Sequence, residues 1–312
     1  MALDIKKQLK KNPFVLAPMD NVTDIGFREL CEKHNASYTI SELTSVEALI
    51  RDKIPKYRYE RGSLKTNCVQ LFGSNEKAFG VVGEYVEDEA DMIDVNFGCP
   101  SPTVTRNESG AKLLEDPDKV GKIIQRLCDN TNKPVSAKLR LGYKKENYIE
   151  VAKEIEDAGA SLVTVHARLG KDGYSKKADW DKIKRLKESI DLPLIGNGDI
   201  NSEKDVDRYL NEYADGIMIG RAAIGNPLIF ERMQHYHSKG SKLEMHDIKK
   251  RQKELFIEYL RNIENRDMYK KEFKIKQQAM WFMKGIEGAK DLRVRICKLD
   301  NINDIIEEVN NF

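Results

Sequence analysis

The sequence of 312 residues has little cysteine, no long apolar run and almost no net charge. Its five cysteines are scattered and none forms a Cys-x-x-Cys pair, which argues against a disulfide framework and a zinc site. No window approaches the roughly 18 uninterrupted apolar residues of a membrane span. The basic N-terminal segment lacks the apolar core of a signal peptide. We therefore expect a cytoplasmic protein with no membrane segment and no metal. We also expect a monomer, although none of these features bears on the oligomeric state.

The balance of charged residues excludes a further class of protein. Lys and Arg number 53 and Asp and Glu number 51, so the formal net charge is +2. This excludes a strongly basic nucleic-acid coat, but it leaves room for a local basic patch that binds RNA. An early Gly-x-Gly-x-x-Gly motif is also missing, which disfavours a doubly wound dinucleotide-binding sheet.

Short apolar runs recur along most of the chain, and a helical pattern follows many of them. We predict strands at 14–19, 38–43, 67–72, 92–97, 135–140, 162–167, 192–197 and 216–219. Helices are predicted at 76–89, 117–130, 148–158, 180–189 and 202–212, with caps at Asp116 and Ser202 and a terminator at Gly159. Eight such units predict an α/β fold of the TIM (β/α)8 barrel type.

The pattern changes at 237–247, beyond which no strand-like run occurs. Helical patterns cover 247–264, 268–284, 289–298 and 302–310. We therefore predict a barrel domain over 1–237 and a C-terminal all-α helical bundle domain over 243–312, with a linker at 238–242.

The predicted strands end in residues that can hydrogen-bond or transfer a proton. In chain order they are Pro18, Met19, Asp20, Glu42, Gln70, Asn96, Cys99, Lys138, Arg140, His166, Arg168, Asn197, Gly198, Asp199, Gly220 and Arg221. In a TIM barrel the active site lies at the carboxyl ends of the strands. Each residue alone is typical of an ordinary surface or core position, but together they predict one site.

The last two strand ends, "LIGNGDI" and "GIMIGRAAIGNP", are rich in glycine. TIM barrels commonly bind phosphate at this place, and Arg221 would add a charge-assisted hydrogen bond. The alternative is that these glycines only form tight turns. Gln70 and Lys138 suit the edge of a planar ring, because an amide both donates and accepts and a cation stabilises a reduced ring. We therefore predict flavin mononucleotide (FMN) as cofactor.

Several longer motifs support a more specific interpretation. They are "LAPMDNVTDIGFREL", "VQLFGSN", "IDVNFGCPSPTVTRNESGAKLL", "VSAKLRLGY", "VTVHARLGKDGYSKKADW", the two glycine-rich segments and "WFMKGIEGAKDLRVRI". Over nearly the whole chain they resemble, in content and order, the motifs of the tRNA-dihydrouridine synthases. The resemblance implies an FMN-binding TIM barrel, a helical domain that helps to hold tRNA, and NADPH as reductant. The implied reaction reduces the C5–C6 double bond of uridine.

The resemblance also implies roles for individual residues. Pro18, Met19 and Asp20 would line the flavin, with Gln70, Lys138 and His166 at its ring. Asn197, Gly198, Asp199, Gly220 and Arg221 would hold its side chain and phosphate. Cys99 matches the proton donor, since hydride at C6 leaves C5 in need of a proton and a thiol with a pKa of roughly 8.5 can supply one. The other cysteines, Cys31, Cys68, Cys128 and Cys297, are predicted to be core residues.

Substrate contacts are predicted in both domains. Asn96 is placed to hydrogen-bond the uracil edge, and Arg168 lies at the same strand ends. Pro102 and Thr103 stand where many relatives have lysines, and Asp20 where many have a small residue; Arg106 would supply the missing charge. In the helical domain we expect tRNA contacts from Lys270, Lys271, Lys274 and Arg293. The spacing puts the three lysines on one helix face, although such a face is equally typical of a solvated surface.

Two alternatives stay open. One is an FMN-dependent dehydrogenase of a free pyrimidine, similar to dihydroorotate dehydrogenase, for which the basic helical tail has no use. The other is an RNA-binding module without catalysis, which the intact Cys99, Lys138 and His166 disfavour. The sequence gives no nicotinamide site and does not indicate which uridine is reduced.

Overall fold

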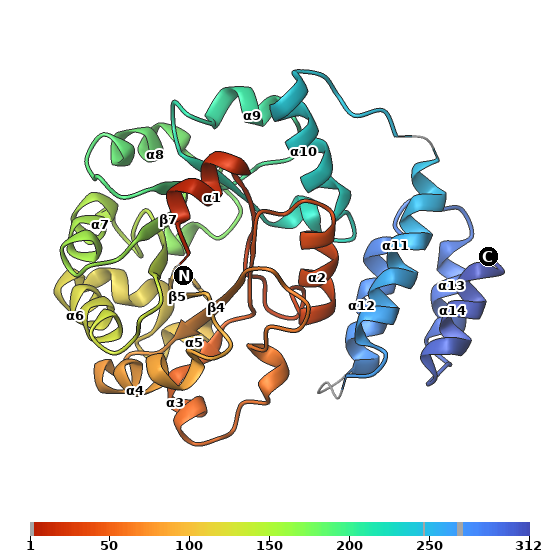
Figure 1. Cartoon of the computed structure of the whole chain (residues 1–312), viewed down its shortest axis with the longest axis horizontal. Coiled ribbons are helices and arrows are strands. Elements are labelled where there is room, and N and C mark those ends of the chain that lie inside the picture. Colours follow the sequence, from red (N-terminus) through yellow and green to blue (C-terminus); the bar gives the residue numbers. More distant parts are fainter. Residues whose placement is uncertain (1–2, 246, 267–270) are drawn as a thin grey trace.

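The computed structural model describes residues 3–245, 247–266 and 271–312. Within them, eight parallel strands close into a barrel (Figure 1). These strands are β1 (Phe14–Leu16), β2 (Thr39–Ile40), β4 (Asn67–Phe72), β5 (Met92–Phe97), β6 (Val135–Arg140), β7 (Leu162–His166), β8 (Leu194–Asn197) and β9 (Gly216–Ile219). The predicted TIM barrel is confirmed, and the doubly wound sheet is excluded.

The ring of strands is closed by two pairings. β9 pairs with β1, with Phe14 opposite Ile217, and β2 pairs with β4, with Thr39 opposite Asn67. A ninth strand, β3 (Thr44–Ser45), pairs with the end of β4 and was not predicted. All eight carboxyl ends therefore meet at one end of the barrel.

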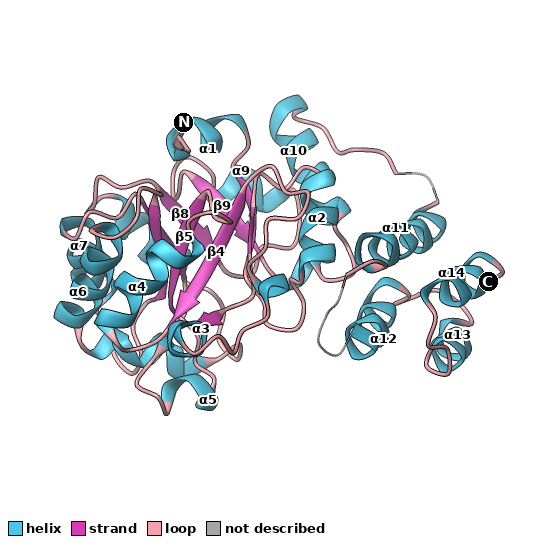
Figure 2. Cartoon of the chain, turned by 60° about the horizontal axis from the view of Figure 1, so that its bottom comes forward, coloured by secondary structure: helices cyan, strands magenta, loops and turns pink. Residues whose placement is uncertain are grey.

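Helices surround the barrel, and α1 and α5 lie at its two opposite ends (Figure 2). They are α1 (Ile5–Lys11), α2 (Ile25–Lys33), α3 (Val46–Ile50), α4 (Glu76–Val86), α5 (Pro102–Thr105), α6 (Pro117–Cys128), α7 (Tyr148–Asp157), α8 (Trp180–Lys187), α9 (Lys204–Tyr209) and α10 (Leu228–Lys239), with 3-10 turns at Lys56–Arg58, Gly110–Glu115, Gly170–Asp172 and Arg221–Ala223. Asp116 caps α6 as predicted. The predicted cap at Ser202 is wrong: α9 begins at Lys204, and Asp205 instead accepts a hydrogen bond from the Ser202 N–H.

Apolar side chains are buried on both faces of the barrel strands, as is typical of parallel sheets. One buried cluster fills the barrel and includes Val15, Ile40, Met92 and Met218, together with Leu9 of α1. A second, larger cluster lies between the strands and the surrounding helices. Since both faces of each strand are covered, apolar residues run without strict alternation.

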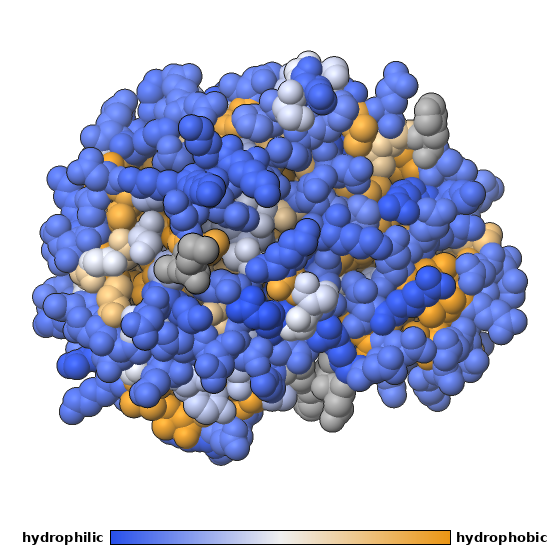
Figure 3. Space-filling view, viewed as in Figure 1, coloured by the Kyte–Doolittle hydropathy of each residue, from blue (hydrophilic) through white to orange (hydrophobic). Residues whose placement is uncertain are grey.

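The C-terminal part consists of α11 (Ile248–Ile263), α12 (Lys271–Phe282), α13 (Ala289–Ile296) and α14 (Ile302–Asn310), which we call the helical region. α11 packs on α2, and the four helices pack on one another (Figures 1 and 2). The boundary between two domains stays a prediction. Figure 3 shows a mostly hydrophilic face with small separate apolar patches. No described helix combines the length and the apolar character needed to cross a membrane.

Candidate active site

A cavity of about 380 Å³ lies at the carboxyl ends of the strands, and we call it the barrel-end cavity. Its volume falls within the roughly 300–1,000 Å³ of small-molecule sites. The predicted residues that line it are Pro18, Met19, Asp20, Asn96, Cys99, Lys138, His166, Arg168, Asn197, Gly198, Asp199, Gly220 and Arg221. Sequence positions spread over two thirds of the chain therefore meet at one place, as the strand-end argument predicted.

Cys99 is held by the backbone of its own loop. Asn96 at the end of β5 accepts hydrogen bonds through Oδ1 from the N–H groups of Gly98 (3.1 Å) and Cys99 (2.8 Å). The Cys99 carbonyl in turn accepts one from Ala111. Gly110 has φ of +62°, and a Cβ there would lie 2.6 Å from the Cys99 carbonyl oxygen, so only glycine fits. This packing fixes the thiol at the cavity wall.

A buried polar chain lies beneath this loop. Gln70 accepts a hydrogen bond through Oε1 from Asn96 Nδ2 (2.9 Å) and donates through Nε2 to Asp94 (2.7 Å). Asp94 also accepts from the Ser136 hydroxyl (2.6 Å). Gln70 is fully buried and does not line the cavity, so here it supports Asn96. Burial raises the pKa of Asp94 to about 6, against the effect of both hydrogen bonds.

The part of the cavity wall that includes Lys138, Arg140 and Arg168 is electropositive. Burial, with neighbouring Arg140, lowers the pKa of Lys138 to about 8, and its Nζ is 3.5 Å from Asn197 Oδ1. Burial and then the surrounding cations, Lys138 first, lower the pKa of His166 strongly. The Arg168 guanidinium is 3.1 Å from His166 Nε2, and since arginine only donates, that nitrogen accepts and the proton of the neutral ring is on Nδ1.

The Cys99 thiol is held in its protonated form. Burial raises its pKa, as does the negative charge of Asp20, while the Ser101 backbone, Arg140 and Lys138 act in the opposite direction. A protonated thiol that is partly shielded from water can act as a general acid. Cys99 lines the cavity together with Lys138 and His166.

Asp199 organises the far end of the cavity. Its carboxylate accepts two hydrogen bonds from Arg168 Nη2 (2.7 and 2.6 Å) and one from Arg221 Nη2 (3.1 Å). Burial raises the pKa of Asp199, but the bonds from Arg168 and the Ala178 N–H outweigh it and lower the pKa overall. Arg168 is buried, and its hydrogen bonds to Asp199 and His166 hold both of these side chains in position. In contrast, half of the Arg221 side chain is exposed.

Tyr174 is a cavity residue that the sequence reasoning missed. It is 60% exposed, lines the cavity and lies with its ring 4.3 Å from the Arg221 guanidinium, with Arg140 and Arg168 at 5.9 Å. The signal available was an aromatic residue within the glycine-rich loop after β7. An exposed ring at the edge of a polar cavity offers a stacking surface for a planar group.

Two further predictions lie outside this cavity. Arg106 is the exposed C-cap of α5, beyond the lining residues. Arg293 is half-buried on α13 in the helical region. Their roles stay predictions.

The predicted basic helix face is wrong in part. Lys270 lies outside the described residues. Lys271 donates to the carbonyl oxygens of Glu264 (2.6 Å) and Arg266 (3.0 Å) after α11. Lys274 is buried and ion-paired with Glu42 (3.0 Å), so it is not on an exposed face and cannot take a phosphate there.

The remaining cysteines are not all core residues. Cys31 and Cys68 are buried as predicted, and Cys128 is half-buried against the core. Cys297 follows the last turn of α13 and is exposed, so its assignment to the core is wrong. Among the described residues, no three His, Cys, Asp or Glu side chains come together in a way that could hold a metal ion.

Sequence comparisons with known proteins indicate one family. The family model described as dihydrouridine synthase matches residues 15–311. The chain is 33% identical over 311 residues to the probable tRNA-dihydrouridine synthase of Aquifex aeolicus (strain VF5), with 96% of both chains covered. It is 36% identical over 238 residues to tRNA-dihydrouridine synthase B of Vibrio vulnificus (strain CMCP6), with 74% of both covered. It is 34% identical over 257 residues to tRNA-dihydrouridine synthase B of Shewanella oneidensis, with 80% of this chain and 79% of the relative covered.

Proposed function

The chain belongs to the dihydrouridine synthase family, and from this premise we propose that it reduces the C5–C6 double bond of uridine in tRNA, with FMN as cofactor, NADPH as reductant and Cys99 as proton donor to C5. The observation that carries the proposal is the barrel-end cavity, which has a protonated thiol and a half-buried lysine among its lining residues.

The residues present fit FMN. A Cβ on Gly220 would find its nearest neighbours, Ala17 and Met19, at 3.6 and 3.8 Å, so protein packing alone does not require glycine and a ligand can approach the backbone closely. The following 3-10 turn, Arg221–Ala223, begins with N–H groups that have no partner within it. Arg221 and these groups would hold the phosphate, and Lys138 would face the ring. When bound, FMN supplies the two-electron reduction.

The protein's own part in the chemistry is the proton. Cys99 Sγ would give its proton to C5, and water would restore it. Burial and Asp20 keep the thiol protonated at neutral pH. A serine hydroxyl is far too weak an acid for this step. Asn96 donates one amide hydrogen to Gln70 and has a second one for the uracil edge.

The substrate base must leave its stack to reach this cavity. Tyr174 offers a stacking surface at the cavity edge, and the exposed Arg106 lies in the neighbouring loop after β5. Because Lys271 and Lys274 hold other parts of the protein, tRNA contacts on the helical region would come from the half-buried Arg293 and from exposed basic side chains.

A two-stage single-turnover assay tests the proposal. Purified protein is scanned for a flavin spectrum, reduced with NADPH, and mixed with unmodified tRNA or free uridine. We expect flavin reoxidation and dihydrouridine on tRNA alone, slowed about 10²–10⁴-fold in Cys99→Ser. Cys297→Ser, which changes an exposed cysteine outside the cavity, is the matched control and should react like wild type.

Other results would contradict the proposal. A colourless protein that FMN does not reconstitute would indicate an RNA-binding module. Turnover of free pyrimidine without tRNA would indicate a small-molecule dehydrogenase. Equal rates for Cys99→Ser and wild type would remove Cys99 from the proton step.

A further inference from the structure

The positively charged side chain of Lys274 is buried, which is unusual for a lysine. It lies on α12 and is only 4% exposed, with its Nζ 3.1 and 3.0 Å from the two carboxylate oxygens of Glu42. Glu42 follows β2 in the barrel and is 1% exposed. Burying a single charge costs several kcal/mol, so the opposite charges of these two groups stabilise each other. The pair joins the helical region to the strand ends.

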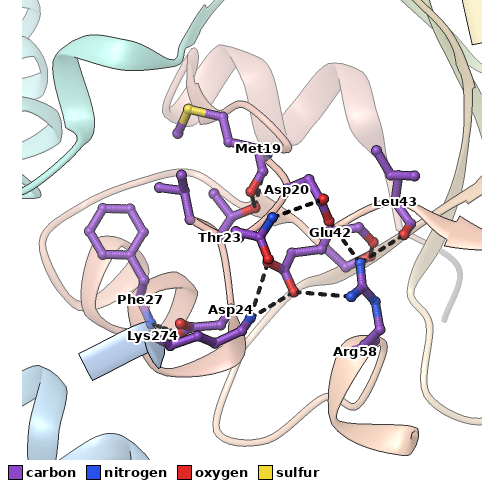
Figure 4. A network of polar contacts seen from close by, with 12 residues as sticks. Met19, Asp20, Thr23, Asp24, Phe27, Glu42, Leu43, Arg58 and Lys274 are labelled. Carbon is purple, nitrogen blue, oxygen red and sulfur yellow. Dashed lines mark hydrogen bonds and ion pairs between the residues drawn. The ribbon is translucent and has the colours of Figure 1, made fainter. Parts of the chain in front are cut away.

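Glu42 has a second cation within reach. Arg58 Nη1 is 4.0 Å from Glu42, while Arg58 Nη2 donates to Asp20 (2.9 Å) and to the Leu43 carbonyl (3.1 Å) (Figure 4). Asp20 and Leu43 both line the barrel-end cavity. One arginine therefore stands between a buried carboxylate and a carboxylate at the cavity wall.

The loop that carries Asp20 rests on the helical region. Tyr259 of α11 donates to Asp24 (3.0 Å), and Gln278 of α12 donates to the Val22 carbonyl (3.1 Å). Within the loop, the N–H groups of Val22 and Thr23 donate to the Met19 carbonyl (3.0 Å each). The loop from Ala17 to Asp24 is thus closed on itself and attached to two helices more than 230 residues away in sequence.

The charges decide which carboxylate Arg58 binds. While Lys274 neutralises Glu42, Arg58 is available to Asp20. Without the Lys274 charge, Glu42 becomes a buried carboxylate whose nearest remaining cation is Arg58, and the cost of an unpaired buried charge exceeds that of an unpaired exposed one. Asp20 is about half exposed and can return to water.

We propose that Lys274 is a positioning residue for catalysis: by neutralising Glu42 it leaves Arg58 bound to Asp20, and so keeps Asp20 and its loop in place at the cavity wall beside Cys99. The docking of the helical region is then part of the active site as well as of the substrate surface. The role in turnover rests on the proposed function, whereas the state of the loop does not.

Two matched variants break the same buried ion pair with opposite results. Lys274→Gln leaves an uncompensated negative charge that competes for Arg58. Glu42→Gln leaves no negative charge at position 42 that could compete for Arg58, so Arg58 stays bound to Asp20. Both should lower the melting temperature, but only Lys274→Gln should speed hydrogen exchange of the Val22 and Thr23 amides, by about three- to tenfold. The double variant should return exchange to the wild-type rate.

The measurement is hydrogen exchange on the protein as purified, without tRNA, so it does not depend on the reaction. Lys276→Met, two residues along α12, is the control and should leave the loop unchanged. Equal acceleration in Lys274→Gln and Glu42→Gln, or none in either, would overturn the proposal, because it would leave only a general effect on stability. Should Lys274→Gln not fold, Arg58→Gln must accelerate exchange to the same degree, and wild-type exchange there would also overturn it.

Turnover gives the second readout. In Lys274→Gln, tRNA-dependent flavin reoxidation should slow, and the change should vanish when Asp20 is already replaced by Asn, since both act through one chain. Additive effects would contradict the assigned route. If exchange behaves as expected but no variant, wild type included, reduces tRNA, the proposed function fails and the coupling of Lys274 to the loop stands.

Discussion

Asp94 lies at the bottom of the polar chain that supports the Cys99 loop, and it should make stability depend on pH. Its pKa is raised from 3.8 to about 6 by burial, so the folded protein binds this proton more tightly than the unfolded chain. The stabilisation is complete below pH 3.8 and lost as the pH rises through 6. We expect the free energy of unfolding of wild type, relative to Asp94→Asn, to fall by about 3 kcal/mol over this range.

Urea unfolding of both proteins between pH 4.5 and 7.5 covers the upper part of this range, in which about 2 kcal/mol of the fall is expected. Asp118→Asn, an exposed acid at the start of α6, is the control and should show no comparable trend. A constant difference between wild type and Asp94→Asn would mean that Asp94 is ionised throughout. The polar chain would then need a different protonation state from the one that burial indicates.

Lys138 should make the affinity for FMN depend on pH above neutrality. Its pKa of about 8 means that it is charged at pH 7 and mostly neutral at pH 9. Since a charged ammonium donates a stronger hydrogen bond to the acceptor atoms of the ring than a neutral amine does, FMN affinity should be full below pH 8 and decline above it. In Lys138→Met the affinity should be about tenfold weaker at pH 7 and constant with pH, as measured by quenching of flavin fluorescence. Wild-type affinity that stays constant from pH 7 to 9.5 would exclude this role.

Single residues show where sequence reasoning stops. The strand-end residues could be predicted because topology alone brings carboxyl ends together. The spacing of Lys271 and Lys274 correctly puts them on one helix, but spacing does not tell which way a helix face points. The partner of Lys274 is Glu42, 232 residues earlier, and only the docking of α12 reveals it. Cys297 fails for a similar reason, since it falls one residue beyond the buried turn that ends at Ile296.

At the scale of elements, burial on both faces decides which boundaries are predictable. β4, β5, β6 and β9 have the predicted bounds because nearly all of their residues are buried, so the sequence pattern changes where each strand ends. β1 ends at Leu16 rather than at residue 19, since Pro18 has no N–H for the ladder and the chain turns into the loop that lines the cavity. β3 was missed because two residues carry no periodic signal.

Helix packing at Gly26 gives an element-scale prediction. A Cβ on this α2 residue would lie 2.3 Å from Ile263 and 3.3 Å from Tyr259 of α11, so Gly26→Ala pushes the two helices apart. We expect a loss of about 1–3 kcal/mol in unfolding free energy, despite the better helix propensity of alanine. Gly121→Ala on α6 is the control: its nearest contact, at 3.2 Å, is the flexible end of Glu154, and it should be neutral or stabilising. Equal effects would show that α2 and α11 can separate freely.

At the scale of the whole molecule, the barrel and the helical region share too many buried groups to be independent. Gly225 lies against the backbone of Trp281, and Gly26 lies against α11. The barrel and the helical region therefore approach each other closely at two separate points. Glu42 and Asp24 are buried acids whose partners are Lys274 and Tyr259. Removing the helical region would take both of these partners away.

The full chain should therefore unfold in one step. We expect thermal loss of helix, followed by circular dichroism at 222 nm, to coincide with release of flavin, because the loop that lines the cavity is attached to α11 and α12. A chain ending at residue 240 should be insoluble or lack flavin, since the loop that carries Asp20 would lose its hydrogen bonds from Tyr259 and Gln278. Two separated transitions, or a truncated barrel that retains flavin at the wild-type affinity, would show that the helical region only binds substrate and that the cavity is complete without it.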